Sequence, residues 1–303
     1  MVALLKTSIS NLKMRTPVLL ASGVLGSSYG TINRVIEETL VGAIVTKSFT
    51  KEPRNGYPTP IVAYVKSGLL NAVGLANPGY KMLKELLRNV SRNVPIIVSI
   101  ASSTPQEFAE IAEYAEEAGA NAVELNLSCP HVKGHGLEVG QDPEYVGKIV
   151  ENVKSVSNIP VFVKLGYSDK VVEVAKRAEK AGADAIVAIN TIRAMAIDVY
   201  AKKPILSNTY GGLSGPAIHP IAVRIVYDLY KVIEIPIVGV GGVMDWKDAV
   251  ELMLAGASAI AVASAIAVKG LNVINEIVEG IQKYLENEGF GKISDIVGLA
   301  HKN

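Results

Sequence analysis

Short, continuously apolar segments alternate along the chain with longer segments whose apolar residues recur at helical spacing. Eight apolar segments, rich in Val, Ile, Leu and Ala, occupy residues 17–26, 42–48, 95–101, 122–128, 160–166, 184–190, 236–242 and 259–265. Runs of this length without polar alternation are typical of strands buried on both faces of a parallel sheet. We therefore predict eight parallel strands with helices between them.

The boundaries of the intervening helices carry the expected signals. Thr104 and Asp142 each precede a proline and are good helix caps, and Asp245 opens a third helix. Three similar phrases then join a helix to the next strand through a glycine that can adopt the left-handed conformation. These glycines are Gly119, Gly182 and Gly256. The repeated helix–glycine–strand phrase indicates consecutive βα units.

Eight such units in 303 residues predict a (β/α)8 TIM barrel, with a doubly wound open sheet as the alternative. No linker or low-complexity stretch divides the chain, so residues 1–303 are interpreted as a single domain. Two insertions, at residues 50–78 and 202–216, contain glycines and prolines and little helical pattern. We expect both to form loops over the carboxyl-terminal face of the barrel.

Composition narrows the class of protein further. Apolar residues make up 49% of the chain and charged residues 19%, which is enough for a large core. The formal charge of +1 argues against nucleic acid as the main partner, because phosphate binding needs a basic surplus. No apolar run approaches the roughly 20 residues of a membrane span, and residues 1–16 lack a secretory pattern. We therefore expect a cytoplasmic protein without membrane contact.

In such a barrel, catalytic residues lie at the carboxyl ends of the strands. Lys47 and Lys164 occupy such positions, as do Asn126 and Asn190, and Asn71 lies in the insertion after the second strand. A single lysine there could simply extend its charge into water. Two lysines and several amides at one barrel mouth instead favour a site for an anionic, amide-rich ring.

A second candidate site follows the last two strands, where these barrels commonly bind phosphate. Gly241 and Gly242 end the seventh strand, and Ala263 and Ser264 end the eighth. Glycines let backbone N–H groups approach a phosphate closely, and a helix start adds positive charge. The glycines also resemble a loose dinucleotide motif, but the acidic residue that such a motif requires is missing.

Cys129 is the only cysteine of the chain. One thiol can form neither an internal disulfide nor an iron–sulfur cluster without a partner. Because Cys129 follows a strand end and precedes Pro130, a functional thiol is favoured over a buried apolar residue. His131 and His135 lie in the same glycine-containing loop without neighbouring carboxylates, so no metal site is predicted.

Taken in order and spacing, these phrases resemble the catalytic subunit of class 1 dihydroorotate dehydrogenases, nearest the B type. The resemblance runs from Thr16 to about Ala267. It rests on Leu-Ala-Ser-Gly at 20–23, Thr-Lys-Ser at 46–48, the asparagine loop at 71–77, Asn-Leu-Ser-Cys-Pro at 126–130, Ile-Asn-Thr at 189–191, Gly-Gly-Leu-Ser-Gly-Pro at 211–216 and Gly-Gly at 241–242.

The resemblance implies an FMN enzyme that oxidises (S)-dihydroorotate to orotate in de novo pyrimidine biosynthesis. Cys129 would take the C5 proton, hydride would pass from C6 to N5 of FMN, and Lys164 would face the N1–C2 side of the flavin. The implied cofactor contacts are Ser22, Lys47, Ser48, Ser99, Asn126, Lys164, Ile189, Gly215, Gly241, Gly242, Ala263 and Ser264. The implied substrate contacts are Lys47, Asn71, Ala72, Val73, Gly74, Leu75, Asn126, Asn190 and Thr191.

Five positions depart from the family pattern. His131 and Ser99 replace asparagines, Gly166-Tyr167 replaces Ser-Pro after Lys164, and His219 stands where lysine is frequent. None removes the base or the two lysines.

The family also implies partners. The B type passes electrons to NAD through a partner subunit that carries FAD and an iron–sulfur cluster, whereas the A type uses fumarate alone. A homodimer, or a heterotetramer with two partner chains, is therefore expected. The alternatives are a dihydropyrimidine dehydrogenase-like FMN reductase of uracil or thymine, a flavin-free lyase or isomerase that binds a phosphorylated substrate, and a non-catalytic binding barrel.

Overall fold

The computed structural model describes residues 5–127 and 139–302 of the chain. Eight parallel strands form a closed barrel, since the last barrel strand along the chain pairs with the first barrel strand. In chain order they are β3 (Val18–Leu20), β4 (Ala43–Val45), β7 (Ile96–Ile100), β8 (Ala122–Asn126), β9 (Val161–Leu165), β10 (Ala185–Ala188), β15 (Ile237–Val240) and β16 (Ala257–Val262). Closure confirms the predicted (β/α)8 barrel and rules out the open sheet.

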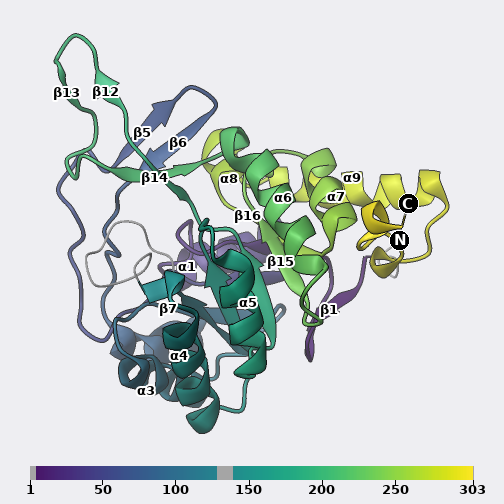
Figure 1. The fold of residues 1–303 in the computed structure, drawn as a ribbon, viewed down its shortest axis with the longest axis horizontal. Coiled ribbons are helices and arrows are strands. Elements are labelled where there is room, and N and C mark those ends of the chain that lie inside the picture. Colours follow the sequence, from purple (N-terminus) through teal and green to yellow (C-terminus); the bar gives the residue numbers. More distant parts are fainter. Residues whose placement is uncertain (1–4, 128–138, 303) are drawn as a thin grey trace.

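Helices surround the barrel (Figure 1). They are α1 (Tyr29–Glu38), α2 (Leu83–Asn89), α3 (Pro105–Glu117), α4 (Pro143–Val156), α5 (Val171–Lys180), α6 (His219–Tyr230), α7 (Trp246–Ala255), α8 (Ser264–Lys269) and α9 (Val273–Glu288). The short 3-10 helices are η1 (Tyr80–Met82), η2 (Val139–Gln141), η3 (Pro216–Ile218), η4 (Ile293–Asp295) and η5 (Leu299–His301). Within the described ranges, no helix has the length and apolar character needed to cross a membrane.

The predicted helix starts are confirmed. The Thr104 hydroxyl accepts a hydrogen bond from the backbone N–H of Glu107 at the start of α3. Asp142 caps α4 in the same way, and Asp245 forms a reciprocal capping box at the start of α7. Several predicted strands were too long at their carboxyl ends. The eighth, for example, begins at Ala257 and stops at Val262, because α8 starts at Ser264.

The core has two layers. The larger packs the outward-facing strand residues against the helices, and the smaller fills the barrel interior with residues such as Leu19, Phe162 and Val187. Ile9 and Met14, from the hairpin of β1 (Thr7–Ile9) and β2 (Leu12–Met14), belong to this interior layer. Because the hairpin leads directly into β3, it closes the amino-terminal end of the barrel, and a cavity that reaches the barrel interior must open at the other end.

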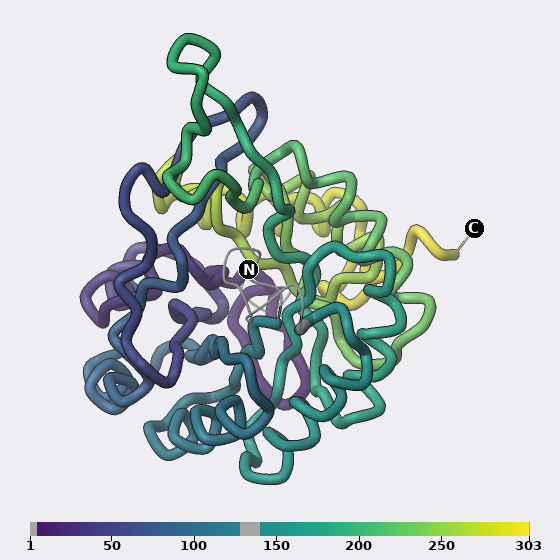
Figure 2. Tube along the Cα trace, turned by 60° about the vertical axis from the view of Figure 1, so that its left-hand side comes forward, coloured from purple at the N-terminus to yellow at the C-terminus, as the bar shows by residue number. Residues whose placement is uncertain are grey.

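Two segments far apart in the chain meet above that other end, as Figure 2 shows. They form a four-stranded antiparallel sheet in the order β11-β14-β6-β5, hereafter the antiparallel sheet. Its strands are β5 (Val62–Val65), β6 (Gly68–Asn71), β11 (Ile192–Ala194) and β14 (Gly211–Ser214). A hairpin of β12 (Ile197–Asp198) and β13 (Lys203–Pro204) projects beyond it (Figure 1).

The prediction of two loop insertions needs a correction. The second insertion begins with β11 at Ile192, ten residues before the expected start, and both insertions contain strands. Asn71 pairs with Gly212 and Leu70 with Leu213 across the two insertions. Leu70, Ala72 and Leu206 form a small core beneath this sheet. The pairing went unrecognised because each strand spans only three or four residues and its partner is distant in sequence.

Candidate active site

Polar side chains from neighbouring barrel strands point into the carboxyl-terminal end of the barrel. Glu124 and Asn126 lie two residues apart on β8 and therefore share its inner face. Asn126 is paired in register with Lys164 of β9, and Glu124 with Ser99 of β7. This ladder brings an acid, an amine, an amide and a hydroxyl together inside an otherwise apolar barrel.

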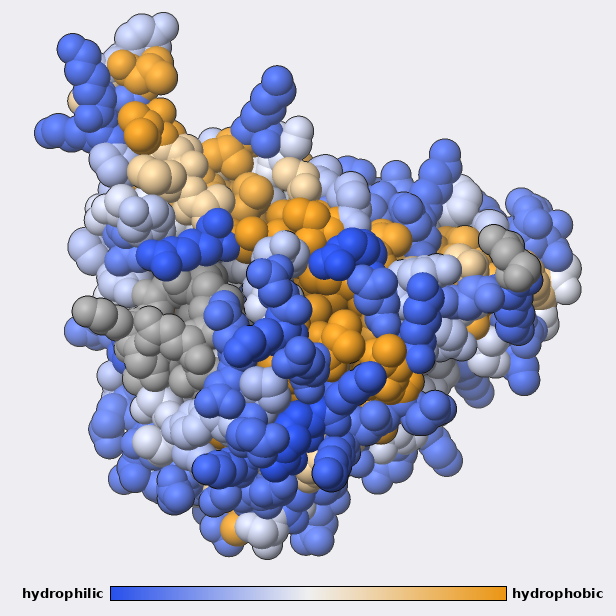
Figure 3. Space-filling view, in the orientation of Figure 1, coloured by the Kyte–Doolittle hydropathy of each residue, from blue (hydrophilic) through white to orange (hydrophobic). Residues whose placement is uncertain are grey.

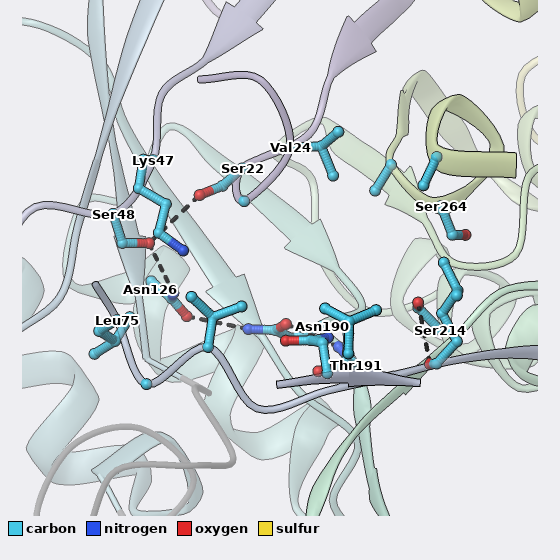
Figure 4. A pocket seen from close by; sticks show the side chains of 18 of the residues that line it. Ser22, Val24, Lys47, Ser48, Leu75, Asn126, Asn190, Thr191, Ser214 and Ser264 are labelled. Atoms are coloured by element: carbon cyan, nitrogen blue, oxygen red, sulfur yellow. Dashed lines mark hydrogen bonds between the residues drawn. The ribbon is translucent and has the colours of Figure 1, made fainter. Parts of the chain in front are cut away.

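Ser48 is the centre of a hydrogen-bonded network at this end (Figure 4). Its hydroxyl lies 2.9 Å from that of Ser99 and 3.4 Å from that of Ser22, and it accepts from Asn126 Nδ2 at 3.0 Å. Asn126 Oδ1 in turn accepts from Asn190 Nδ2 at 3.1 Å. The chain of contacts crosses from the end of β4 to the segment after β10.

Glu124 determines which group donates and which accepts in each hydrogen bond of this network. The Ser99 hydroxyl donates to Glu124 Oε1 at 3.3 Å, and an ionised carboxylate can only accept. Ser99 has one proton to give, so Ser48 must donate to Ser99, which leaves the Ser48 oxygen to accept from Asn126. The buried carboxylate thereby fixes which way the amide of Asn126 points, and through it the amide of Asn190.

Glu124 also forms a buried ion pair. Lys164 Nζ lies 3.7 Å from Glu124 Oε1, and the two side chains are 7% and 2% exposed. A buried charge is tolerated when it is paired and hydrogen-bonded, which Glu124 achieves through Lys164 and Ser99. Sequence reasoning missed Glu124, although an acid in the middle of the apolar run Ala-Val-Glu-Leu-Asn was a visible signal.

A cavity of about 250 Å³ opens over the network. The barrel side contributes Lys47, Ser48, Asn126 and Lys164, and the antiparallel sheet contributes Val62, Leu69, Asn71 and Ser214. The Asn71 amide donates to the Gly212 carbonyl at 3.3 Å, which ties this side chain to the sheet. The cavity is thus walled by both halves of the fold.

A smaller recess of about 70 Å³ shares seven lining residues with this cavity and extends it toward β15 and β16. Gly241 and Gly242 line the recess with positive φ angles of 143° and 67°. Ala263 and Ser264 line it from the end of β16. The two sites expected separately from the sequence therefore form one continuous space.

Most of the residues expected at the site line the cavity or the recess. They are Ser22, Lys47, Ser48, Asn71, Val73, Gly74, Leu75, Asn126, Lys164, Ile189, Asn190, Thr191, Gly241, Gly242, Ala263 and Ser264. Three others do not: Ala72 lies in the small core under the antiparallel sheet, Ser99 lies behind Ser48, and Gly215 lies behind Gly242. Cys129, His131 and His135 fall outside the described residues.

His219 received no role from the sequence, but it lies in a defined cluster. Its ligand atoms and those of Asp248 and Glu251 lie within 4.8 Å of one another, the kind of grouping that can hold a metal ion. The distances of 3.2 Å to Glu251 and 3.8 Å to Asp248 equally suit a direct ion pair. The expectation that the chain binds no metal stays a prediction.

Comparison with known proteins decides the family. Residues 4–285 match the family described as dihydroorotate dehydrogenase. The chain belongs to this family. A Pyrococcus furiosus protein named dihydroorotate dehydrogenase B (NAD(+)), catalytic subunit, is 50% identical over 98% of this chain and 99% of its own length. A Pyrococcus abyssi protein of the same name is 48% identical over 99% of this chain and 100% of its own.

The predicted family, enzyme class and reaction are thereby confirmed: the chain is an oxidoreductase that oxidises dihydroorotate in pyrimidine biosynthesis, and its family uses a flavin. An Aeropyrum pernix protein that carries a provisional A-type (fumarate) name is also 50% identical, over 98% of both chains. Relatives with the two acceptor names are therefore equally similar to this chain.

Proposed function

We propose that this chain, acting as one barrel domain of residues 1–303, binds FMN and dihydroorotate together in the cavity at the barrel mouth. The observation that carries the proposal is the convergence of Lys47, Lys164, Asn126 and Asn190 on a single space that continues into a glycine-lined recess. Charged and amide groups suit a polar heterocycle, and close backbone approach suits a phosphate.

The donor set fits FMN. Ser22, Ser48, Asn126 and Lys164 supply hydrogen-bonding groups from two strands and from the segments that follow two others, and the recess offers Gly241, Gly242 and Ser264 at its far end. A Cβ atom added to Gly23, which also lines the cavity, would meet no atom within 4 Å, so the space above it is open. We assign the ring to the lysine end and the phosphate to the glycine end.

Dihydroorotate fits the wall nearest the antiparallel sheet. Asn71, Asn190 and Thr191 offer donors and acceptors for its amide edges and carboxylate, and Val73 and Leu75 offer apolar contact. The Thr191 backbone N–H donates to Asn190 Oδ1 at 2.8 Å, which leaves the Asn190 amide nitrogen directed at Asn126. The side chains that would hold the substrate are thus oriented before it binds.

The chemistry divides between cofactor and protein. FMN, when bound, supplies the two-electron acceptor for the oxidation. Cys129, three residues after the last residue of β8 in the sequence, is proposed as the base that removes the C5 proton. Lys47 and Lys164 carry positive charge at the cavity wall, which favours the anionic substrate and any negative charge that develops during reaction.

For the final electron acceptor we propose NAD, reached through a second chain that carries FAD and an iron–sulfur cluster, because two of the relatives described above are named as B-type catalytic subunits. The single cysteine of this chain cannot hold such a cluster. Fumarate, accepted without a partner, is the second candidate and is favoured by the Aeropyrum relative. A dimer of this chain, and a cytoplasmic location, stay predictions.

The test is anaerobic. The chain is purified alone, its visible spectrum is recorded, and dihydroorotate is added. We expect a yellow protein that bleaches on mixing, and a Cys129→Ala variant that keeps its flavin but is reduced about 10²–10⁴-fold more slowly. A colourless protein that rejects FMN would overturn the cofactor assignment, and an unchanged rate in Cys129→Ala would overturn the base.

The acceptor is tested on the reduced protein. Fumarate and NAD are added separately to the chain alone. Reoxidation by fumarate would favour the A type. Failure of both, followed by NAD reduction once the native partner is restored, would support the B type.

A further inference from the structure

His219 is a buried side chain directly behind the glycine-lined recess. It is the first residue of α6 and is 8% exposed, yet it does not line the recess. A Cβ atom added to Gly242 would approach the His219 Cβ to 2.7 Å, so the two backbones are in close contact. His219 therefore supports the recess from outside without facing any ligand in it.

The imidazole holds one particular peptide group. His219 Nδ1 lies 2.8 Å from the carbonyl oxygen of Gly241, and because a carbonyl can only accept, Nδ1–H is the donor. The peptide between Gly241 and Gly242 is trans, so its C=O and N–H point in opposite directions. With the carbonyl drawn toward His219, the Gly242 N–H points away from His219, and because Gly242 lines the recess while His219 does not, we infer that this N–H faces the recess.

Two carboxylates of α7 hold the imidazole itself. His219 Nε2 lies 3.2 Å from Glu251 Oε2 and 3.8 Å from Asp248 Oδ1. Asp248 is fixed in turn, since its other oxygen accepts from the backbone N–H groups of Met244 and Asp245. Nδ1 thus faces a carbonyl and Nε2 faces two carboxylates, and these contacts fix the orientation of the ring.

We propose that His219 is a positioning residue for the phosphate of FMN. It turns the Gly241–Gly242 peptide so that the Gly242 N–H donates into the recess, and Glu251 and Asp248 keep its ring in that orientation. The inference rests on the proposed function, because it takes the recess to be the phosphate end of the flavin site. It assigns a role to His219, which stands at a position where lysine is frequent in the family.

FMN and riboflavin provide matched probes, since riboflavin lacks only the phosphate. Flavin-bearing protein is diluted, and the release of fluorescent free flavin gives the dissociation constant for FMN. The measurement is repeated after exchange with excess riboflavin. We expect His219→Leu to weaken FMN binding about tenfold or more, the effect of losing a buried hydrogen bond, and to leave riboflavin binding unchanged.

Two further variants distinguish the loss of the hydrogen bond from His219 to the Gly241 carbonyl from a general loss of packing. His219→Asn keeps a donor near the Nδ1 position and should recover most of the FMN affinity. Glu251→Gln, at a side chain that is 59% exposed, should weaken FMN binding only slightly. Should His219→Leu fail to fold, the comparison between wild type and His219→Asn still tests the inference. A tenfold loss of FMN affinity in the asparagine variant would contradict the positioning role of His219.

The remaining outcomes are also decisive. Equal loss of FMN and riboflavin would show a merely structural role and overturn the inference. Loss of FMN from wild type on treatment with a chelator would replace the ion pair with a metal ion on His219, Asp248 and Glu251 and overturn it too. A wild-type protein that binds riboflavin and FMN equally would disprove the phosphate assignment, and one that binds neither would overturn the proposed function itself.

Discussion

The barrel and the antiparallel sheet wall the same cavity but are built in different ways. The barrel side holds its polar groups in a buried network that ends on Glu124, whereas the sheet stands on the three-residue core of Leu70, Ala72 and Leu206. The hairpin that projects beyond the sheet also exposes apolar side chains: Ile197 and Val199 are 56% and 74% exposed there, where Figure 3 shows hydrophobic atoms. If the proposed site is correct, the chemistry lies on the half of the fold with the larger core, and part of the substrate wall lies on the half with the smaller core, which we expect to open more easily.

The largest loss of stability is expected at the buried ion pair of Glu124 and Lys164. Glu124→Gln leaves the shape of the side chain but removes its charge from Lys164. Breaking a buried pair by removing one partner costs about 3–5 kcal/mol. The variant should therefore unfold at a clearly lower denaturant concentration, measured at saturating FMN so that ligand stabilisation is equal.

Ser99→Ala is the matched control for this prediction. It removes the hydroxyl that donates to Glu124 and leaves both charges in place. Its cost should be that of one buried hydrogen bond, about 1–3 kcal/mol. Equal stabilities of the two variants would show that the charge of Glu124 contributes little and that hydrogen bonding alone holds the network.

The same contrast between the barrel and the antiparallel sheet explains how much of the fold could be predicted from the sequence. The barrel follows from local information: each strand is one apolar run, and several helices begin at a side-chain cap, as at Thr104 and Asp245. The antiparallel sheet joins Leu70 to Leu213, and nothing near either residue marks the other as its partner. Contacts over so long a sequence separation are set by packing rather than by local pattern.

The residues of the site fall into the same two groups, those that local sequence could predict and those that it could not. Lys47, Asn126 and Lys164 could be placed at one mouth because parallel strands end on one side of a barrel. Glu124 and His219 could not be assigned, because their roles depend on what they touch: Ser99 and Lys164 for the one, the Gly241 carbonyl for the other. The burial of Ala72 in the small core could not be predicted for the same reason, since the fold of the first insertion decides which of its residues face the cavity.

A core substitution in the antiparallel sheet should have a smaller and local effect. Leu70 is 1% exposed, and Leu70→Ala would cost about 2–5 kcal/mol of local packing. We expect faster amide hydrogen exchange in β5 and β6 and a weaker apparent affinity for dihydroorotate in flavin reduction, with the bound flavin retained. Leu125→Ala, in the barrel core, is the control and should lower global stability instead. Loss of flavin from Leu70→Ala would show that the two halves do not act separately.

The smallest effect concerns the link between the first insertion and the barrel. Lys51 Nζ lies 2.8 Å from Glu110 Oε2 of α3, and Tyr80 donates to the other oxygen at 2.8 Å. The hydrogen bond from Lys51, and then that from Tyr80, lower the pKa of Glu110 below its ordinary value of 4.5. A lowered carboxylate pKa stabilises the fold above the ordinary value, and this contribution is lost as pH falls through the pKa of the folded state.

The measurement is the difference in melting temperature between wild type and Glu110→Gln as a function of pH. Because both side chains of the pair are 40% exposed, the difference should be small. It should be present at pH 7, shrink as pH falls from about 4.5, and disappear once Glu110 is protonated in the folded protein. A difference that persists unchanged in acid would mean that Glu110 acts through packing, and that the insertion is held to α3 by shape rather than by charge.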